Sequence, residues 1–155
     1  MVHSTILSPD YTLRQAKLHD IWLIIFLIFK ARLDPTQMNW QQFLVIEHHG
    51  SLVAFGQLRN YYLAQELGSL YVSPDFRNQG LGTLLIKNLV IQANQPLYLK
   101  CLKKELINFY AKRSFTVVTY EDLPKSLKSK FFLSQLRKNI FKGFVVFMKY
   151  KELQD

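Results

Sequence analysis

Apolar positions in the first half of the chain follow two different spacings. Residues 11–16 alternate between apolar and polar side chains, which is typical of a strand with one buried face. Residues 21–29 form an unbroken apolar run that indicates a buried helix, which Asp20 can cap and which the Asp34-Pro35 step should end. The pattern then predicts a short helix over residues 36–42 and strands over residues 43–47, 52–59, 61–63 and 66–72.

The second half of the chain alternates helical and strand patterns. Leu81, Leu85 and Leu89 recur with the spacing of one helix face, so a helix should start near Gly82 and end at residues 94–96. The later pattern predicts strands over residues 97–101, 115–120 and 145–150, and helices over residues 104–113 and 123–140.

This order of elements predicts the fold class. Antiparallel strands come first, and strand–helix–strand units follow, so we expect an α/β (mixed α+β) protein with helices on both faces of one central mixed sheet. The chain has 155 residues, a length that suits a single domain over residues 1–155.

Composition and charge narrow the possible partners. Hydrophobic residues make up 49% of the chain, enough for a full core, and the single cysteine excludes a disulfide framework. The longest apolar run has nine residues, where a membrane span needs roughly 20, and no secretory signal pattern is visible. We therefore expect a cytoplasmic protein. The net charge of +9 indicates an anionic partner without identifying it.

The most informative stretch is a strand that ends at Ser73-Pro74 and leads through a glycine-containing loop into a helix. Glycines let backbone amides approach a ligand, and the first N–H groups of a helix form an anion site that a diphosphate fits. A Walker loop is excluded because no Lys precedes Thr83, and a dinucleotide fingerprint is excluded because position 85 is Leu. The remaining pattern is Arg77-x-x-Gly80-x-Gly82.

With this pattern the sequence resembles the GNAT superfamily of acyl-CoA-dependent N-acetyltransferases. The resemblance rests on the loop after the Leu-x-Val-x-Pro strand at residues 70–74, and on the helix at residues 108–115 with its Asn and Tyr. It implies acetyl-CoA as co-substrate and a sheet that splays between the strand before the loop and the next one. It also implies a primary amine as acceptor, on a small molecule, a peptide or a protein.

The resemblance assigns the cofactor site to the strand, the loop and the later helix. Strand backbone would hold the pantetheine arm, loop amides the diphosphate, and Asn108 the cofactor arm. The residues implied are Leu70, Tyr71, Val72, Arg77, Asn78, Gln79, Gly80, Leu81, Gly82, Thr83, Asn108 and Tyr110.

Two residues are candidates for catalysis. An amine must lose its proton before it attacks a thioester, and Glu66 should share a strand face with Leu70 and Val72 because side chains alternate along a strand. Tyr110 matches the family's general acid for the leaving thiolate. The alternatives are a solvated or ion-paired strand carboxylate at Glu66 and a tyrosine that only packs on the cofactor.

One position departs from the family pattern. Ser114 stands where the family usually has a glycine with a left-handed backbone, which costs more for serine.

Cysteine and histidine give no second site. Cys101 has no identifiable base and is best interpreted as an inert buried thiol. We expect no metal, because His3, His19, His48 and His49 show no ligand spacing with cysteine or carboxylates.

Most of the excess charge lies near the end of the chain. Residues 124–142 carry six basic residues and no acid, with apolar residues between them. A helix with a solvated basic face explains this, and so does a docking surface for an acidic partner; no nucleic-acid motif is present.

Three functions therefore stay open. The first is an acetyl-CoA-dependent N-acetyltransferase, and the second is a non-catalytic acyl-CoA-binding module with a basic docking segment. The third is a basic interaction protein whose loop is incidental.

Overall fold

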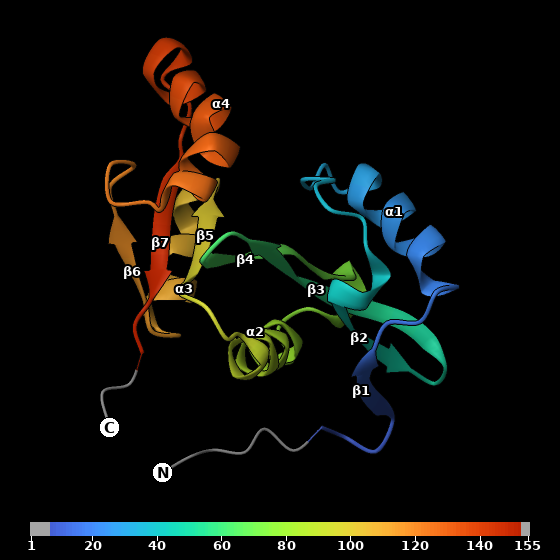
Figure 1. The fold of residues 1–155 in the computed structure, drawn as a ribbon. Helices are drawn as coiled ribbons and strands as arrows, with labels where there is room; N and C mark the ends of the chain where they lie inside the picture. Colours follow the sequence, from blue (N-terminus) through green and yellow to red (C-terminus); the bar gives the residue numbers. More distant parts are fainter. Residues whose placement is uncertain (1–6, 153–155) are drawn as a thin grey trace. The chain divides into compact units, whose positions relative to one another are not determined.

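The computed structural model describes residues 7–152 as seven strands and seven helical segments (Figure 1). The strands are β1 (Tyr11–Gln15), β2 (Phe43–His48), β3 (Ser51–Tyr61), β4 (Ala64–Val72), β5 (Leu97–Cys101), β6 (Phe115–Val118) and β7 (Val146–Tyr150). The α-helices are α1 (Asp20–Lys30), α2 (Leu81–Gln92), α3 (Ile107–Ala111) and α4 (Lys125–Phe141). The 3-10 segments are η1 (Trp40–Gln42), η2 (Pro74–Phe76) and η3 (Lys104–Leu106).

The strands follow the order β1-β2-β3-β4-β5-β7-β6. The β1–β2, β2–β3, β5–β7 and β6–β7 pairs are antiparallel, whereas β4 and β5 are parallel. The parallel ladder is short, since it joins only Gln65 to Leu97 and Glu66 to Tyr98. The predicted mixed, mostly antiparallel sheet is therefore confirmed.

The chain forms two compact units. The first comprises Met1–Arg59 and Leu67–Gln92, and the second comprises Asn60–Glu66 and Ala93–Asp155. Strand β4 contributes to both, because the boundary falls after Glu66. A single domain over residues 1–155 stays a prediction.

Helices cover both faces of the strands in the first unit (Figure 1). Ile24 and Ile28 of α1 are buried in one cluster with Phe55 of β3. The next residue along β3, Gly56, faces the opposite way, because a Cβ placed there would contact Leu85 and Leu89 of α2. Alternation along one strand thus assigns α1 and α2 to opposite faces.

The outer face of α1 is apolar as well. Trp22, Phe26 and Phe29 follow the spacing of one helix face and are 75%, 59% and 65% exposed. Helix α1 therefore carries a buried apolar stripe and a second, exposed one. Within residues 7–152, no helix is long and apolar enough to cross a bilayer.

The second unit has its own core around α4. Leu127 and Phe131 are fully buried with Tyr98 of β5 and Phe147 of β7, and the rings of Phe131 and Phe147 stack at 5.3 Å. The predicted helix over residues 123–140 is thus confirmed with slightly later bounds, and its first half is anchored by these contacts.

The prediction of a short helix over residues 36–42 is wrong for most of this segment, because only η1 (Trp40–Gln42) is helical. Gln57 donates through Nε2 to the carbonyl oxygens of Thr36 and Gln37 at 3.2 and 2.6 Å, and Arg59 Nε donates to that of Thr36 at 3.1 Å. A helix needs these carbonyl groups for its own amides. The buried polar side chains of β3 therefore hold this segment in an irregular conformation.

The capping role expected for Asp20 is also wrong. Asp20 is the first residue of α1, and its carboxylate accepts hydrogen bonds from the Arg14 guanidinium at 2.7 and 3.1 Å. It also accepts one from the backbone N–H of Lys17 at 2.7 Å. The bonds from Arg14 lower the pKa of Asp20, against the opposing effect of burial. The side chain fixes β1 to the start of α1 instead of capping the helix.

Candidate functional site

The loop between β4 and α2 combines two left-handed residues with a helix start. Asn78 has φ 62° and Gly80 has φ 82°, a backbone region that glycine and asparagine enter at low cost. Helix α2 begins at Leu81, and the carbonyl oxygen of Gly80 accepts the N–H of Leu84 at 3.0 Å. Residues 81–83 are therefore the first turn of α2, as the glycine pattern predicted.

This first turn has the geometry of an anion site. The N–H groups of a first helical turn have no carbonyl within the helix to bind, and the helix dipole adds a partial positive charge there. Leu81 is buried and anchors the turn, whereas Arg77, Asn78, Gln79 and Gly80 are exposed. The loop can thus receive a phosphate group from solvent.

Two side-chain bonds hold the loop to neighbouring strands. Arg77 Nε donates to the carbonyl oxygen of Val72 at 3.0 Å. The hydroxyl of Tyr11 on β1 donates to Gln79 Oε1. These bonds restrain the loop from both sides, and a restrained loop loses less conformational entropy when a ligand binds.

Strand β4 contains a β-bulge just before its last residues. A Cβ placed on Gly68 would lie 2.5 Å from Cζ of Arg59, so position 68 faces this guanidinium. The hydroxyl of Ser69 also faces it, since Arg59 Nη2 donates to Ser69 Oγ at 3.1 Å. Two consecutive residues on one face break the alternation of the strand, as an extra bulged residue does.

The bulge overturns the alternation argument for Glu66. Leu70 lies near the α2 face, because a Cβ on Gly56 would contact its side chain at 3.3 Å. Counting back through the bulge puts Glu66 on the face opposite to Leu70 and Val72. The expectation that Glu66 shares their face is therefore wrong.

At the end of β4, the backbone groups of Leu70 and Val72 point away from β3. The N–H of Ser73 donates to the carbonyl oxygen of Val53 on β3 at 2.8 Å. Backbone groups alternate in direction along a strand, so those of Val72 and Leu70 point to the other side. The carbonyl group of Val72, which accepts the hydrogen bond from Arg77, therefore points away from β3.

Glu66 belongs to the second unit and is paired there. Its side chain is 2% exposed, and Oε1 lies 3.3 Å from Nζ of Lys130 on α4. A carboxylate this deeply buried needs such a partner to offset the loss of water. The residue that sequence analysis missed is Lys130, because the two positions lie 64 residues apart and only the fold joins them.

Tyr110 is buried in the second unit on the short helix α3. Its ring packs edge-on against Phe109 and Phe115. The pKa of the Tyr110 phenol is raised from 10.0 to about 12, mainly by burial and to a smaller extent by nearby Cys101, whereas Arg113 acts to lower it. The phenol therefore stays protonated at physiological pH. Asn108 lies two residues earlier on the same helix.

Ser114 adopts the left-handed backbone despite its higher cost for serine, and Cys101 is buried as expected. Ser114 follows α3 with φ 69°, so serine takes the left-handed position that the family usually gives to glycine. Cys101 is buried, its thiol donates to the carbonyl oxygen of Lys103 at 3.1 Å, and burial raises its pKa. A thiol in this state is a poor nucleophile.

Comparison with known families identifies this arrangement. The family model described as "Acetyltransferase (GNAT) domain" matches residues 39–117, from η1 through β6, which are 79 of the 155 residues. The chain belongs to the GNAT family. The expected membership of the GNAT superfamily is thereby confirmed.

Curated relatives of this GNAT chain are longer proteins. The "Amino-acid acetyltransferase" of Buchnera aphidicola subsp. Acyrthosiphon pisum is 27% identical over 133 residues, which cover 77% of this chain and 30% of that protein. The protein of the same name from Shewanella oneidensis is 28% identical over 129 residues, with 75% and 29% covered. The GNAT chain thus spans about a third of the length of these relatives.

Solved structures support the same fold. A Mycobacterium tuberculosis protein crystallised with CoA has a TM-score of 0.73 at 19% identity, with 92% of this chain and 99% of that chain covered. The N-acetylglutamate synthase of Neisseria gonorrhoeae, complexed with CoA and N-acetyl-glutamate, has a TM-score of 0.70 at 18% identity. That match covers 94% of this chain and 36% of the synthase.

The predicted site residues belong to different units. The first unit contains Leu70, Tyr71, Val72 and the loop over residues 77–83, which follows β4 after the short segment η2. Glu66, Asn108 and Tyr110 belong to the second. The signal in the sequence that points to the bulge is Gly68, since an isolated glycine inside a strand often marks a β-bulge.

Proposed function

We propose that this GNAT protein transfers the acetyl group of acetyl-CoA to the primary amine of a small acceptor, with amino acids as the first class to test. The observation that supports this most strongly is the passage from β4 through a loop with two left-handed residues into α2. Family membership supports acetyl-CoA as the ligand, and CoA is bound by two of the similar structures.

The first unit would hold the cofactor. The diphosphate would accept hydrogen bonds from the amides at Leu81 and Gly82, with Arg77 adding positive charge. The pantetheine arm would pair with the outward backbone groups of Leu70 and Val72. The other proposed cofactor contacts of this unit are Tyr71, Asn78, Gln79, Gly80 and Thr83. For Asn108 and Tyr110, which belong to the second unit, a cofactor contact is proposed from the family resemblance alone.

The reaction would be direct attack of a neutral amine on the thioester carbonyl. The N–C bond forms, a tetrahedral intermediate places negative charge on the carbonyl oxygen, and the C–S bond then breaks. A strand amide near Val72 would stabilise the oxyanion. Glu66 is the proposed base that removes the amine proton, and it acts through water because its carboxylate is buried and paired with Lys130.

Tyr110 is the proposed donor to the leaving sulfur. A phenol with a pKa of about 12 is a weaker acid than a thiol with a pKa near ~8.5, so complete transfer is uphill by about 5 kcal/mol. The buried phenol therefore stabilises the thiolate through a hydrogen bond. Full transfer needs a cofactor-bound state that lowers the pKa of Tyr110.

Cofactor binding is tested first, by thermal shift with acetyl-CoA. A ligand at 100 times its dissociation constant should stabilise the native protein by about 2.7 kcal/mol. Gly80→Ala should abolish most of this shift, because it strains a left-handed residue inside the loop. Gly50→Ala is the matched control, since Gly50 has φ 78° in the β2–β3 turn and its Cβ would meet open space. No shift for the unmodified protein, or equal losses in both variants, would contradict the proposal.

Turnover is tested by measuring the CoA thiol released in the presence of amino acids, including L-glutamate, and of polyamines and peptides. Glu66→Gln should lower kcat by about 10²-fold or more at unchanged acetyl-CoA binding. Tyr110→Phe should lower kcat with little change in KM. Binding that survives both substitutions without any turnover would instead indicate a non-catalytic acyl-CoA-binding module.

A further inference from the structure

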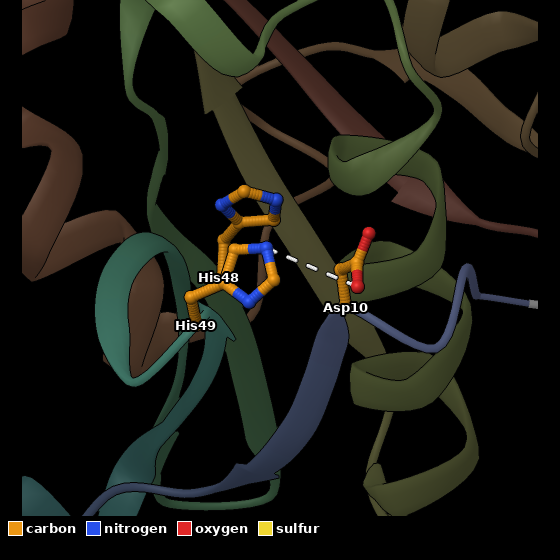
Figure 2. A group of neighbouring side chains, drawn as sticks. All are labelled: Asp10, His48 and His49. Atoms are coloured by element: carbon orange, nitrogen blue, oxygen red, sulfur yellow. Dashed lines mark ion pairs between the residues drawn. The ribbon is translucent and has the colours of Figure 1, made fainter.

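Three polar side chains converge where β1 begins and β2 ends (Figure 2). One ligand atom each of Asp10, His48 and His49 lies within 4.8 Å of the other two. Asp10 immediately precedes β1, and the antiparallel ladder pairs Tyr11 with His48. The sequence showed no metal spacing because only this ladder brings Asp10 beside the two histidines.

The turn after β2 orients the histidines. Consecutive residues of a strand point to opposite faces, but His49 has φ 49° and leaves the strand geometry. Its ring therefore lies on the side of His48, with 4.3 Å between the ring centroids, and Nε2 lies 3.8 Å from Asp10 Oδ1. The backbone N–H of His49 donates to the carbonyl oxygen of Asp10 at 3.2 Å, which fixes the two segments together.

Two imidazoles and a carboxylate are a donor set that suits a borderline-soft divalent cation. Zinc binds histidine nitrogen and carboxylate oxygen at about 2.0–2.2 Å, which separates neighbouring ligand atoms by roughly 3.3 Å in a tetrahedron. Asp10 and His49 are exposed and can close the remaining distance by rotating their side chains. Three protein ligands would leave one coordination position for water.

Two aromatic rings, those of Tyr11 and Phe76, link the cluster to the proposed cofactor loop. The His48 ring contacts the rings of Tyr11 and Phe76, with centroid distances of 4.7 and 5.1 Å, and these two rings also contact each other. Phe76 ends η2 at the start of the loop, and Tyr11 donates to Gln79 within it. A reorientation of His48 would therefore change its contacts with both rings, one of which is bonded to Gln79 in the loop.

We propose that Asp10, His48 and His49 bind a divalent transition-metal ion of the zinc class, and that this site is coupled to the cofactor loop through His48. The metal site depends only on the three side chains. The coupling rests on the proposed function, because it requires acetyl-CoA at the loop.

The metal site is tested by isothermal titration calorimetry of the untagged chain with Zn²⁺. The wild type should bind one equivalent. Asp10→Asn and His49→Asn should each weaken Zn²⁺ binding by at least about tenfold. Asparagine is chosen at position 49 because it adopts the left-handed backbone of that residue at low cost. His3→Gln and His19→Gln are the controls and should leave binding unchanged. The site is wrong if the wild type does not bind Zn²⁺, if both cluster variants bind like the wild type, or if a control removes binding.

The coupling is tested by titrating acetyl-CoA, which has no free thiol, with and without bound Zn²⁺. Its affinity should change by at least about threefold in the wild type and not in His49→Asn, and acetyl-CoA should change the Zn²⁺ affinity by the same factor. Independent binding of the two ligands would overturn the coupling and leave the metal site standing. If acetyl-CoA fails to bind at all, the proposed function and the coupling both fall, and the Zn²⁺ titration still decides the metal site.

Discussion

Ser114 occupies a left-handed backbone position that costs an L-residue roughly 1–2 kcal/mol. Ser114→Gly should raise the free energy of unfolding by about 0.5–1 kcal/mol, because the relief of strain exceeds the extra freedom of glycine in the unfolded chain. Urea denaturation measures this difference. Ser129→Gly, within α4, is the control and should destabilise by about 0.5 kcal/mol. A destabilised Ser114→Gly would show that the serine side chain makes a compensating contact.

A side chain at position 68 should destabilise the protein, because Arg59 occupies the space beside Gly68. An added Cβ would lie 2.5 Å from Cζ of Arg59, which is 1% exposed and bonded to Ser69 and to the carbonyl oxygens of Asp34 and Thr36. Gly68→Ala must displace this buried cation, so we expect a loss of about 2–3 kcal/mol in denaturant unfolding. Gly143→Ala is the control, because its Cβ would meet atoms only at 3.8 Å and beyond. Equal effects of the two substitutions would contradict the packing argument.

Tyr110 should make stability depend on pH in the alkaline range. Its pKa is raised by burial from 10.0 to about 12, so its contribution is fully present below pH 10 and is lost as the pH rises to 12. Two pKa units correspond to about 2.7 kcal/mol. The difference in unfolding free energy between the wild type and Tyr110→Phe should shrink across this window, whereas that for the exposed Tyr62→Phe should stay constant. A constant difference for Tyr110→Phe would show that the phenol is accessible to water.

The residues that sequence analysis found are those whose role depends on local backbone. Gly80 and the start of α2 follow from spacing alone, because a turn and a helix N-terminus are short-range structures. Lys130 and Arg59 were missed, because their contacts join distant segments or depend on a bulge. No local pattern encodes such a contact.

Among helices and strands, the predictions that rest on a local pattern are confirmed, whereas the one that depends on contacts with distant residues fails. Helices α2 and α4 fill long periodic segments, so their apolar faces predict them. The segment over residues 36–42 lacks such a face, and its carbonyl groups bind the buried side chains Gln57 and Arg59. Tertiary hydrogen bonds therefore decide its conformation against its local propensity.

The ion pair between Glu66 on β4 and Lys130 on α4 should stabilise the packing of these two elements. Lys130→Met leaves a buried carboxylate without this cation and should destabilise the protein by about 3 kcal/mol. Glu66→Gln should cost less, because Lys130 is partly exposed and can turn to water. The double variant should be more stable than the sum of the two losses predicts, as a double-mutant cycle in urea measures. Additive losses would show that the two side chains do not interact.

For the whole molecule, net charge and exposed apolar surface have opposite effects on self-association. A net charge of +9 keeps molecules apart, whereas Trp22, Phe26 and Phe29 on α1 favour association. Near 1 M salt the screening length falls to about 3 Å, so light scattering should show more self-association there than in dilute buffer. Phe26→Glu should suppress this effect, and replacing the exposed Tyr62 by Gln should not. Salt-independent scattering would mean that the α1 stripe is too small to drive association.

The buried Arg59 also has a consequence for how this chain changes during evolution. Its guanidinium fills the space beside Gly68 and binds the carbonyl oxygens of Asp34 and Thr36 at the same time. Replacement of either residue alone is costly, so positions 59 and 68 should change together among relatives. A relative with a side chain at position 68 should lack the arginine, and its segment after α1 is then free to diverge in length and conformation.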